Sequence, residues 1–200
     1  FVRLGVVSVS PIAQHHVVVS AVSNVHEQSI HSRLLRNIKM QDLFSIKGKT
    51  ALVTGGSRGI GEMIAAGFLA NGAKVYISSR KREACDATAK RLMGKFGGEC
   101  ISLPADLSNI DGIDAAVKSF GEMEDNLDIL VNNSGGPPAG RAVDISEEVW
   151  LQSIDMALMF FIRMSRESVP HMKDGGWGRI VNILASSVYQ PIDNLVTSGV

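Results

Sequence analysis

The sequence is poor in cysteine, has no long apolar run, and carries no excess of charge of either sign. Cys85 and Cys100 form neither a CxxC motif nor a disulfide framework, so we expect two reduced, structural thiols. The formal net charge is +0, so the chain has no excess of positive charge with which to attract nucleic acid. No apolar run approaches the roughly eighteen residues of a membrane span. The composition favours one soluble domain with no nucleic-acid or membrane partner, and we assign no metal-binding residues.

The most informative feature that is present is the glycine-rich segment TGGSRGIG at residues 54–61. An apolar run precedes it and apolar residues at helical spacing follow it, which predicts a strand, a turn and a helix. Glycine lets the backbone approach a pyrophosphate, and a helix N-terminus presents free N–H groups. We therefore expect a nucleotide to contact Gly55, Ser57, Arg58, Gly59, Ile60 and Gly61.

Strand and helix patterns alternate along the rest of the chain. We expect strands at 50–53, 74–78, 100–103, 128–131 and 179–184. We expect helices at 59–70 and 81–96, a third capped by Ser108, and a long fourth opened by Ser146. Such alternation predicts an α/β fold with a parallel, doubly wound sheet.

The spacing of the glycines separates two kinds of dinucleotide site. Three residues lie between Gly55 and Gly59 and one lies between Gly59 and Gly61, the reverse of the common fingerprint. This order, continued by segments 105–107, 130–135 and 178–183, resembles the short-chain dehydrogenase/reductase family over residues 44–200. The likeness is strongest to members that reduce 3-oxoacyl groups on acyl carrier protein. It implies a Rossmann fold and reduction of a small-molecule carbonyl, or oxidation of the matching alcohol.

The cofactor is expected to be NADP(H). At the end of the strand 74–78, an acidic side chain would bind the ribose 2′-hydroxyl of NAD, but the chain has Ser79 and Arg80 there. The guanidinium group of Arg80, together with that of Arg58 in the glycine-rich segment, is suited to bind the 2′-phosphate of NADP(H).

The resemblance implies further cofactor contacts. Asp106 and Leu107 would lie at the adenine, and Asn132, Ser134 and Gly135 would lie beneath the adenine ribose. Asn133 is expected to tie strands together instead.

The catalytic residues of the family are largely missing. Relatives use a tyrosine, a lysine four residues later, a serine and an asparagine, but no Tyr-x-x-x-Lys occurs here. Alignment puts Ala157 at the asparagine position, Ala185 at the serine position and Ser198 at the tyrosine position. A shift of one residue makes Ser186 the single catalytic candidate.

Two functions remain open at this point. The first is an NADP(H)-dependent oxidoreductase acting on a carbonyl, with a 3-oxoacyl thioester as one candidate substrate. The alternative is a catalytically silent, cofactor-binding member with a regulatory or structural role. The resemblance also implies a homodimer.

The two ends of the chain carry separate expectations. Residues 1–39 are basic and poor in acid, so they are either a mitochondrial transit peptide or an extension ahead of a start at Met40 in a cytoplasmic protein. We expect them to be disordered. Residues 40–200 would form an incomplete Rossmann domain. Since relatives continue beyond this point, we expect a fragment with an exposed apolar edge beside the strand 179–184.

Overall fold

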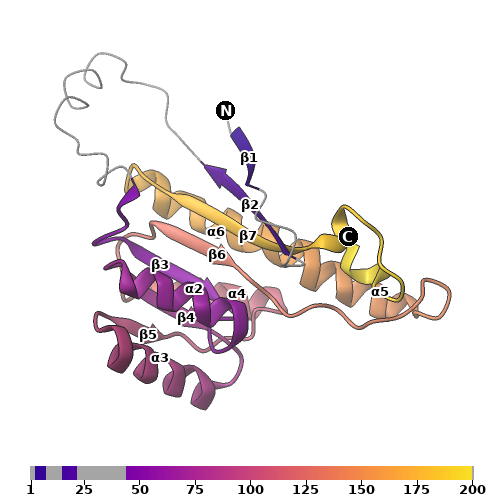
Figure 1. Ribbon diagram of the computed structural model, residues 1–200, viewed down its shortest axis with the longest axis horizontal. Helices are drawn as coiled ribbons and strands as arrows, with labels where there is room; N and C mark the ends of the chain where they lie inside the picture. The colour runs from indigo at the N-terminus through magenta and orange to yellow at the C-terminus, as the bar shows by residue number, and fades with distance from the viewer. Residues whose placement is uncertain (1–2, 8–14, 22–43, 200) are drawn as a thin grey trace.

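Short β-prone segments in the middle of the chain assemble into a parallel sheet (Figure 1). The computed structural model describes residues 3–7, 15–21 and 44–199. Two antiparallel strands, β1 (Arg3–Val7) and β2 (His15–Ala21), extend this sheet at one edge, so the seven strands lie in the order β1-β2-β7-β6-β3-β4-β5. The five parallel strands are β3 (Thr50–Thr54), β4 (Lys74–Ser78), β5 (Cys100–Ser102), β6 (Ile129–Asn132) and β7 (Arg179–Ala185).

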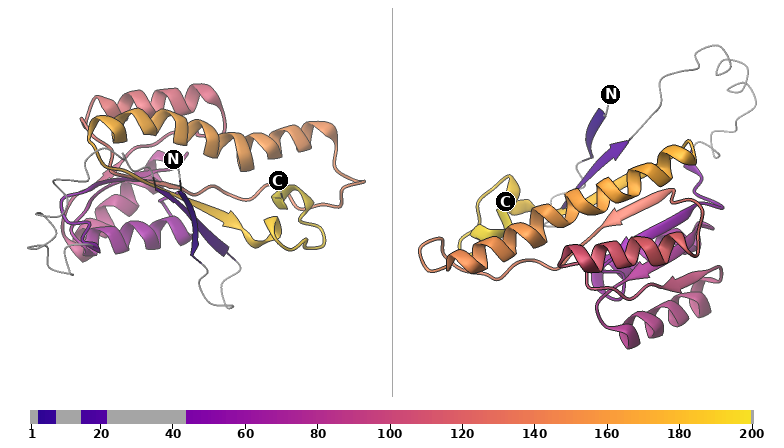
Figure 2. Two further views of the ribbon diagram at one scale, coloured as in Figure 1. Left: turned by 90° about the horizontal axis from the view of Figure 1, so that it is seen from above. Right: turned by 180° about the vertical axis from the view of Figure 1, so that it is seen from behind.

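Helices cover both faces of this sheet, as Figure 2 shows. One face carries α2 (Gly59–Ala70) and α3 (Arg82–Phe96). The other carries α4 (Ile110–Gly121) and a helical rod made of α5 (Glu147–Ile154), η2 (Asp155–Met159) and α6 (Phe160–Asp174). Among the described residues, no helix combines the length and apolar character needed to cross a bilayer.

Alternate residues of each strand feed two hydrophobic cores. Val53 and Ile77 pack on the face of α2 and α3, whereas Leu52 and Tyr76 pack on the face of α4 and α6. Cys85 and Cys100 belong to the first core as free, buried thiols, and burial raises the pKa of Cys100 to about 11. The predicted doubly wound α/β fold is confirmed.

The predicted cap of α4 is wrong by one residue. The N-cap is Asn109, whose side chain accepts a hydrogen bond from the Gly112 amide at 2.8 Å. The backbone is extended at Asn109 (φ −139°), which is the conformation a cap needs. The predicted start of the fourth helix is confirmed, since the Ser146 hydroxyl accepts from the Val149 amide at 3.4 Å.

The expected long fourth helix contains a π-helical turn in its middle, η2. Arg163 in the following turn pairs with Asp155 at the start of η2, at 3.0 Å. This segment places Ala157 toward the carboxyl ends of the strands, where it lines a pocket.

Two segments of the leader form strands, which corrects the expectation of disorder for those residues. β1 (Arg3–Val7) pairs with β2 (His15–Ala21), and β2 runs antiparallel to β7 along its whole length. Valine-rich segments favour strands, and a sheet edge offers free backbone groups to pair with. The edge of β7 is therefore paired, contrary to the predicted exposed edge. The rest of the leader and Met40 lie outside the described residues.

Candidate functional site

The site lies where the chain leaves neighbouring strands toward opposite faces of the sheet. β3 leads to α2 on one face, and β6 leads to the rod on the other. In open α/β sheets, the crevice at such a switch point is the usual ligand site.

The glycine-rich segment fills one side of this crevice. Gly55 and Gly59 have positive φ angles of 60° and 57°, which side chains other than glycine rarely adopt. A Cβ on Gly61 would collide with the Gly55 carbonyl oxygen, so this glycine allows the loop and helix to pack. A Cβ on Gly59 would instead meet nothing within 4 Å. The free N-terminus of α2 therefore faces open space beside Gly59.

Asn133 ties the loops after β3 and β6 together. Its backbone amide donates to the Thr54 hydroxyl at 2.8 Å, and that hydroxyl donates to the Asn133 carbonyl at 2.8 Å. Its side-chain amide donates to the Thr54 and Gly55 carbonyls at 3.2 and 3.5 Å. The interpretation of Asn133 as a strand tie agrees with these bonds.

The Asn132 side chain points into the protein at the end of β6. It is fully buried and donates to Asn182 at 2.9 Å and to Ser165 at 3.3 Å. It connects β6, β7 and α6, and it does not line the pocket at the switch point. The contact expected between Asn132 and the adenine ribose stays a prediction.

The end of β4 lies beside the glycine-rich segment, because the Gly56 amide donates to the Ser78 carbonyl at 3.1 Å. The Ser79 hydroxyl is buried and has no hydrogen-bond partner within the described ranges. Arg80 and Arg58 are exposed and form no ion pair with any residue that the structure describes. A buried hydroxyl without a partner and two arginines without an ion pair in this part of the chain are residue types suited to an anionic oxygen group.

Asp106 and Leu107 lie next to this end of β4. The Ala105 amide donates to the Ser79 carbonyl at 3.1 Å. The Asp106 carboxylate is exposed and accepts from the Ser108 amide at 3.1 Å, while Leu107 packs against the core under α4. The Asp106 carboxylate is therefore hydrogen-bonded within the turn to which it belongs.

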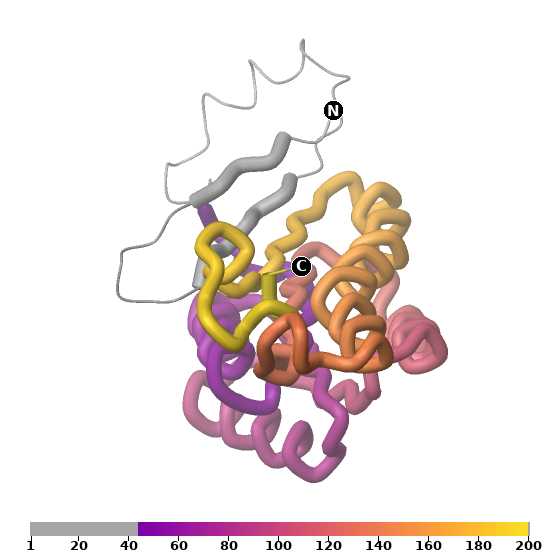
Figure 3. Tube along the Cα trace, turned by 90° about the vertical axis from the view of Figure 1, so that its right-hand side faces the viewer, coloured from indigo at the N-terminus to yellow at the C-terminus, as the bar shows by residue number. Residues whose placement is uncertain are grey.

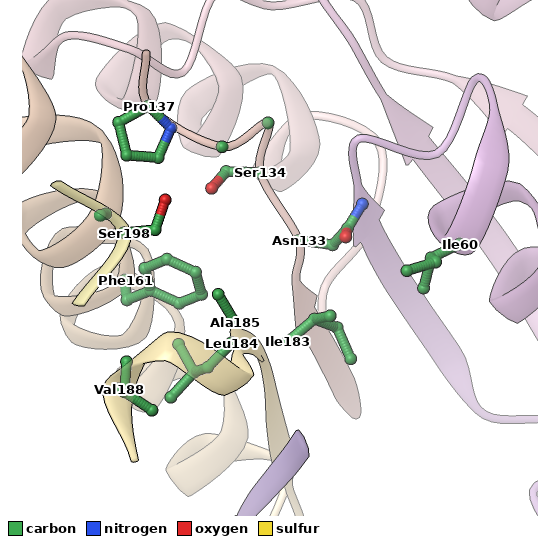
Figure 4. A pocket seen from close by; sticks show the side chains of 13 residues that line it. Ile60, Asn133, Ser134, Pro137, Phe161, Ile183, Leu184, Ala185, Val188 and Ser198 are labelled. Atoms are coloured by element: carbon green, nitrogen blue, oxygen red, sulfur yellow. The ribbon is translucent and has the colours of Figure 1, made fainter. Parts of the chain in front are cut away.

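A cavity of about 260 Å³ continues the crevice past the glycine-rich segment (Figure 4). Its lining comes from four segments: Ile60; Asn133, Ser134, Gly135, Gly136 and Pro137; Ala157 and Phe161; and Ile183, Leu184, Ala185, Val188 and Ser198. The structure therefore brings Ala157, Ala185 and Ser198 together, as the alignment of the family's catalytic positions requires. Ser186 does not line the cavity.

Among the residues that the structure describes, none that lines this cavity has an ionisable side chain. Tyr76 lies in the core under α4, where its hydroxyl donates to Glu124 at 2.6 Å. Burial, together with the Glu124 carboxylate, raises the pKa of Tyr76 to about 12. Tyr189 is 61% exposed and is not part of the lining. Neither tyrosine of residues 44–199 is among the residues that line the cavity.

The segment after β7 is fastened to the loop after β6, which sequence reasoning missed. The Thr197 hydroxyl donates to the Pro138 carbonyl at 2.8 Å, and the Gly140 amide donates to the Asn194 carbonyl at 2.7 Å. Residues near the carboxyl end of the chain therefore lie beside the loop after β6, where Gly140 and Leu195 form an isolated β-bridge (Figure 3). Thr197 is fully buried. We call these two hydrogen bonds the loop staple.

Comparison with known proteins agrees with this geometry. The family model for short chain dehydrogenases matches residues 49–196, which is most of the chain. The chain belongs to the short chain dehydrogenase family. The matched residues include the glycine-rich segment 54–61 and all five parallel strands, β3 to β7.

Similar proteins in this family include several reductases. A rhamnolipids biosynthesis 3-oxoacyl-[acyl-carrier-protein] reductase from Pseudomonas aeruginosa is 52% identical over 96 residues, covering 48% of this chain and 37% of the relative. The oxidoreductase YvrD from Bacillus subtilis is 35% identical over 151 residues, covering 76% of this chain and 56% of the relative. A 3-oxoacyl (acyl-carrier-protein) reductase from Agrobacterium tumefaciens, solved with NADP bound, matches the structure with a TM-score of 0.75 at 26% identity. The match covers 82% of this chain and 63% of that protein. The chain spans about half the length of the curated relatives it matches.

Proposed function

We propose that the chain binds NADP(H) in the crevice between β3 and β6, as part of an oxidoreductase that acts on a small-molecule carbonyl. The observation that carries this proposal is the open space at Gly59, beside the free N-terminus of α2 at the switch point of the sheet. Backbone N–H groups there suit a pyrophosphate, and a side chain in that space would exclude it.

The preference for NADP(H) over NAD(H) rests on the end of β4. The Ser79 hydroxyl, which has no partner in the described part, would donate to the 2′-phosphate, and Arg58 and Arg80 would supply its counter-charge. The Agrobacterium tumefaciens reductase, similar in fold, was solved with NADP. Asp106, Leu107, Ser134 and Gly135 are proposed as further contacts.

The reaction proposed is reduction of a carbonyl, with a 3-oxoacyl thioester as the candidate suggested by the Pseudomonas aeruginosa relative. NADPH supplies the hydride in such a reaction. The apolar walls of the cavity would exclude water from the carbonyl, and its serine hydroxyls would orient the oxygen. The weakly acidic hydroxyl of Ser198 does not replace a phenol with a lysine neighbour as a proton donor.

A second candidate function is a catalytically silent, NADP(H)-binding subunit. The observation in its favour is that Ala157, Ala185 and Ser198 meet in one cavity, and that none of the described residues lining it has an ionisable side chain. The homodimer, and the choice between cytoplasm and mitochondrion for the leader, stay predictions.

Fluorescence titration tests the binding proposal. We expect NADPH to bind at least about tenfold more tightly than NADH, because hydrogen bonds to charged groups contribute about 1.5–3 kcal/mol each. Arg80→Met should remove most of that difference, whereas Arg82→Met, on the exposed start of α3, should retain it. Equal dissociation constants in the wild type would refute the assignment.

Turnover separates the two candidate functions. NADPH oxidation with an acetoacetyl thioester above background would favour the oxidoreductase. Tight NADPH binding with background oxidation, unchanged in Ser198→Tyr, would favour the silent subunit.

A further inference from the structure

The outer edge of β7 is paired along its whole length with a strand from a distant part of the sequence. In Figure 1, β2 runs beside β7, and β1 lies beyond it. The register joins His15 to Ala185 at one end of the ladder and Ala21 to Arg179 at the other. Every residue of both strands therefore has a partner across this edge.

β2 joins the sheet in a different way from the five core strands. Those strands pair in parallel, as β7 does with β6, whereas β2 lies antiparallel on β7. Adding an extended strand to a sheet edge is a recurring way in which proteins bind peptide segments. Main-chain hydrogen bonds then give the affinity, and alternate side chains give the specificity. The edge of β7 therefore has the geometry of a strand-binding site.

The composition of β7 makes its edge a strong template for pairing. Residues 180–185 contain no charged residue and no proline, and Val181 and Ile183 are β-branched. An uncovered edge of this kind pairs readily with other chains. Residues 15–21, with the sequence HHVVVSA, also lack lysine, arginine, acid and proline. The two segments can therefore pair without placing a carboxylate, ammonium or guanidinium group in the interior of the ladder.

The strand that forms the new edge is a weaker template. β1 pairs with β2 over five residues, and these include both Arg3 and Gly5. Charge on an edge strand discourages further pairing, and glycine is depleted in strands. β1 and β2 together therefore replace an uncharged edge with one that carries a charge.

We propose that the outer edge of β7 is a binding site for one extended, uncharged segment, and that residues 15–21 are its intramolecular ligand. A strand attached to the same chain competes at an effective concentration on the order of millimolar. The site is therefore closed to dissolved segments in the full chain, and it opens to a segment of like sequence when β2 is displaced. The inference is independent of the proposed function.

Proline substitutions in the full chain test the inference. Successive N–H groups of a strand point to its opposite edges, so Val18→Pro with Val19→Pro removes one ladder bond on each side of β2. The β7 amides that face β2 should then exchange hydrogen at least about tenfold faster, while those of β3 keep their protection. Val18→Thr with Val19→Thr retains both N–H groups and the preference for strand, and is the matched control.

Fluorescence anisotropy then measures the binding of a labelled peptide with the sequence of residues 15–21. The peptide should bind the double proline variant at least about tenfold more tightly than the wild type or the threonine variant, in which β2 occupies the edge. The same peptide with both prolines should bind none of the three chains. Equal binding to the wild type and the proline variant, or no binding to either, would overturn the inference.

A disulfide test leaves β2 in place and so does not depend on the folding of the proline variant. Val19 and Val181 are partners in the register, so Val19→Cys with Val181→Cys should form a disulfide within one chain. His15→Cys with Val181→Cys places the thiols well out of register and should not form one. Non-reducing electrophoresis and peptide mapping separate links within a chain from links between chains. A link only between chains, or equal linking of both pairs, would contradict residues 15–21 as the intramolecular ligand.

Discussion

At the scale of single residues, Gly59 connects backbone conformation to ligand binding. It needs its positive φ for the turn, and it leaves space for a ligand at the end of α2. Any side chain there would affect both properties, so a test has to separate them.

Gly59→Val should reduce NADPH affinity by more than about tenfold, because the side chain fills the space beside the helix N-terminus. Gly97→Val is a matched control: Gly97 also has a positive φ (71°) and open surroundings, but it ends α3 away from the crevice. Both variants should lose stability, and Gly97→Val by at least as much as Gly59→Val, because its φ of 71° and ψ of −167° lie in a region almost confined to glycine. Fluorescence titration and urea unfolding measure the two effects, and equal NADPH affinities in the two variants would contradict the site.

Glu124 provides a prediction for acid pH. Burial alone would raise the pKa of Glu124, but hydrogen bonds from Lys74 and Tyr76 outweigh it and lower the pKa below its ordinary value. A lowered folded-state pKa stabilises the fold above the unfolded-state pKa of about 4.5, and this stability is lost as pH falls further.

Glu124→Gln should therefore lower the free energy of unfolding at pH 7 by about 2 kcal/mol and flatten its decline between about pH 5 and pH 3. Glu122→Gln, an exposed neighbour without an ion pair in the described chain, should follow the wild type. Urea unfolding across this pH range measures both. Parallel curves for all three proteins would mean that Glu124 titrates normally.

At the scale of helices and strands, most of the fold could be predicted because its signals are local. Strand and helix ranges such as 59–70 and 74–78 follow from apolar spacing and turn residues. The sequence predicts the cap of α4 one residue too early because Ser108 and Asn109 are both good caps, and the sequence alone does not show that Asn109 accepts the bond from the Gly112 amide. The loop staple could not be predicted, since Thr197 and Pro138 are far apart in sequence and meet only through tertiary packing.

Asn109→Ala should destabilise the chain by about 1 kcal/mol, because the Gly112 amide loses its acceptor. Ser108→Ala should change stability by less than about 0.5 kcal/mol, as an exposed side chain outside the cap. Urea unfolding of the two variants measures both changes in stability. A larger loss of stability in Ser108→Ala than in Asn109→Ala would show that Ser108, the residue predicted from the sequence, caps α4.

At the scale of the whole molecule, the loop staple couples two segments that come from distant parts of the chain. Thr197→Val keeps the shape of the side chain but leaves the Pro138 carbonyl without its donor, which should cost about 1–3 kcal/mol. Amide hydrogen exchange should then rise in both 134–140 and 186–199.

Thr88→Val is the control for this effect. The Thr88 hydroxyl is also largely buried and donates to the Ser57 carbonyl at 3.0 Å, on the other face of the sheet. It should lower stability by a similar amount without raising exchange in the two stapled segments. If Thr197→Val raises exchange in only one segment, the two loops are not coupled.

The π-helical turn at Asp155–Met159 holds one residue more than a regular α-helical turn would need. An α-helix closes each turn with hydrogen bonds between residues four apart, whereas the wider turn closes with bonds between residues five apart and accommodates the extra residue. The helix that follows therefore keeps its rotational phase, and Phe160, Phe161 and Met164 stay buried. Deleting one residue from this turn should regularise the helix while those side chains remain in the core. A deletion within α6 would instead rotate the residues after it by about 100° and turn buried side chains toward water.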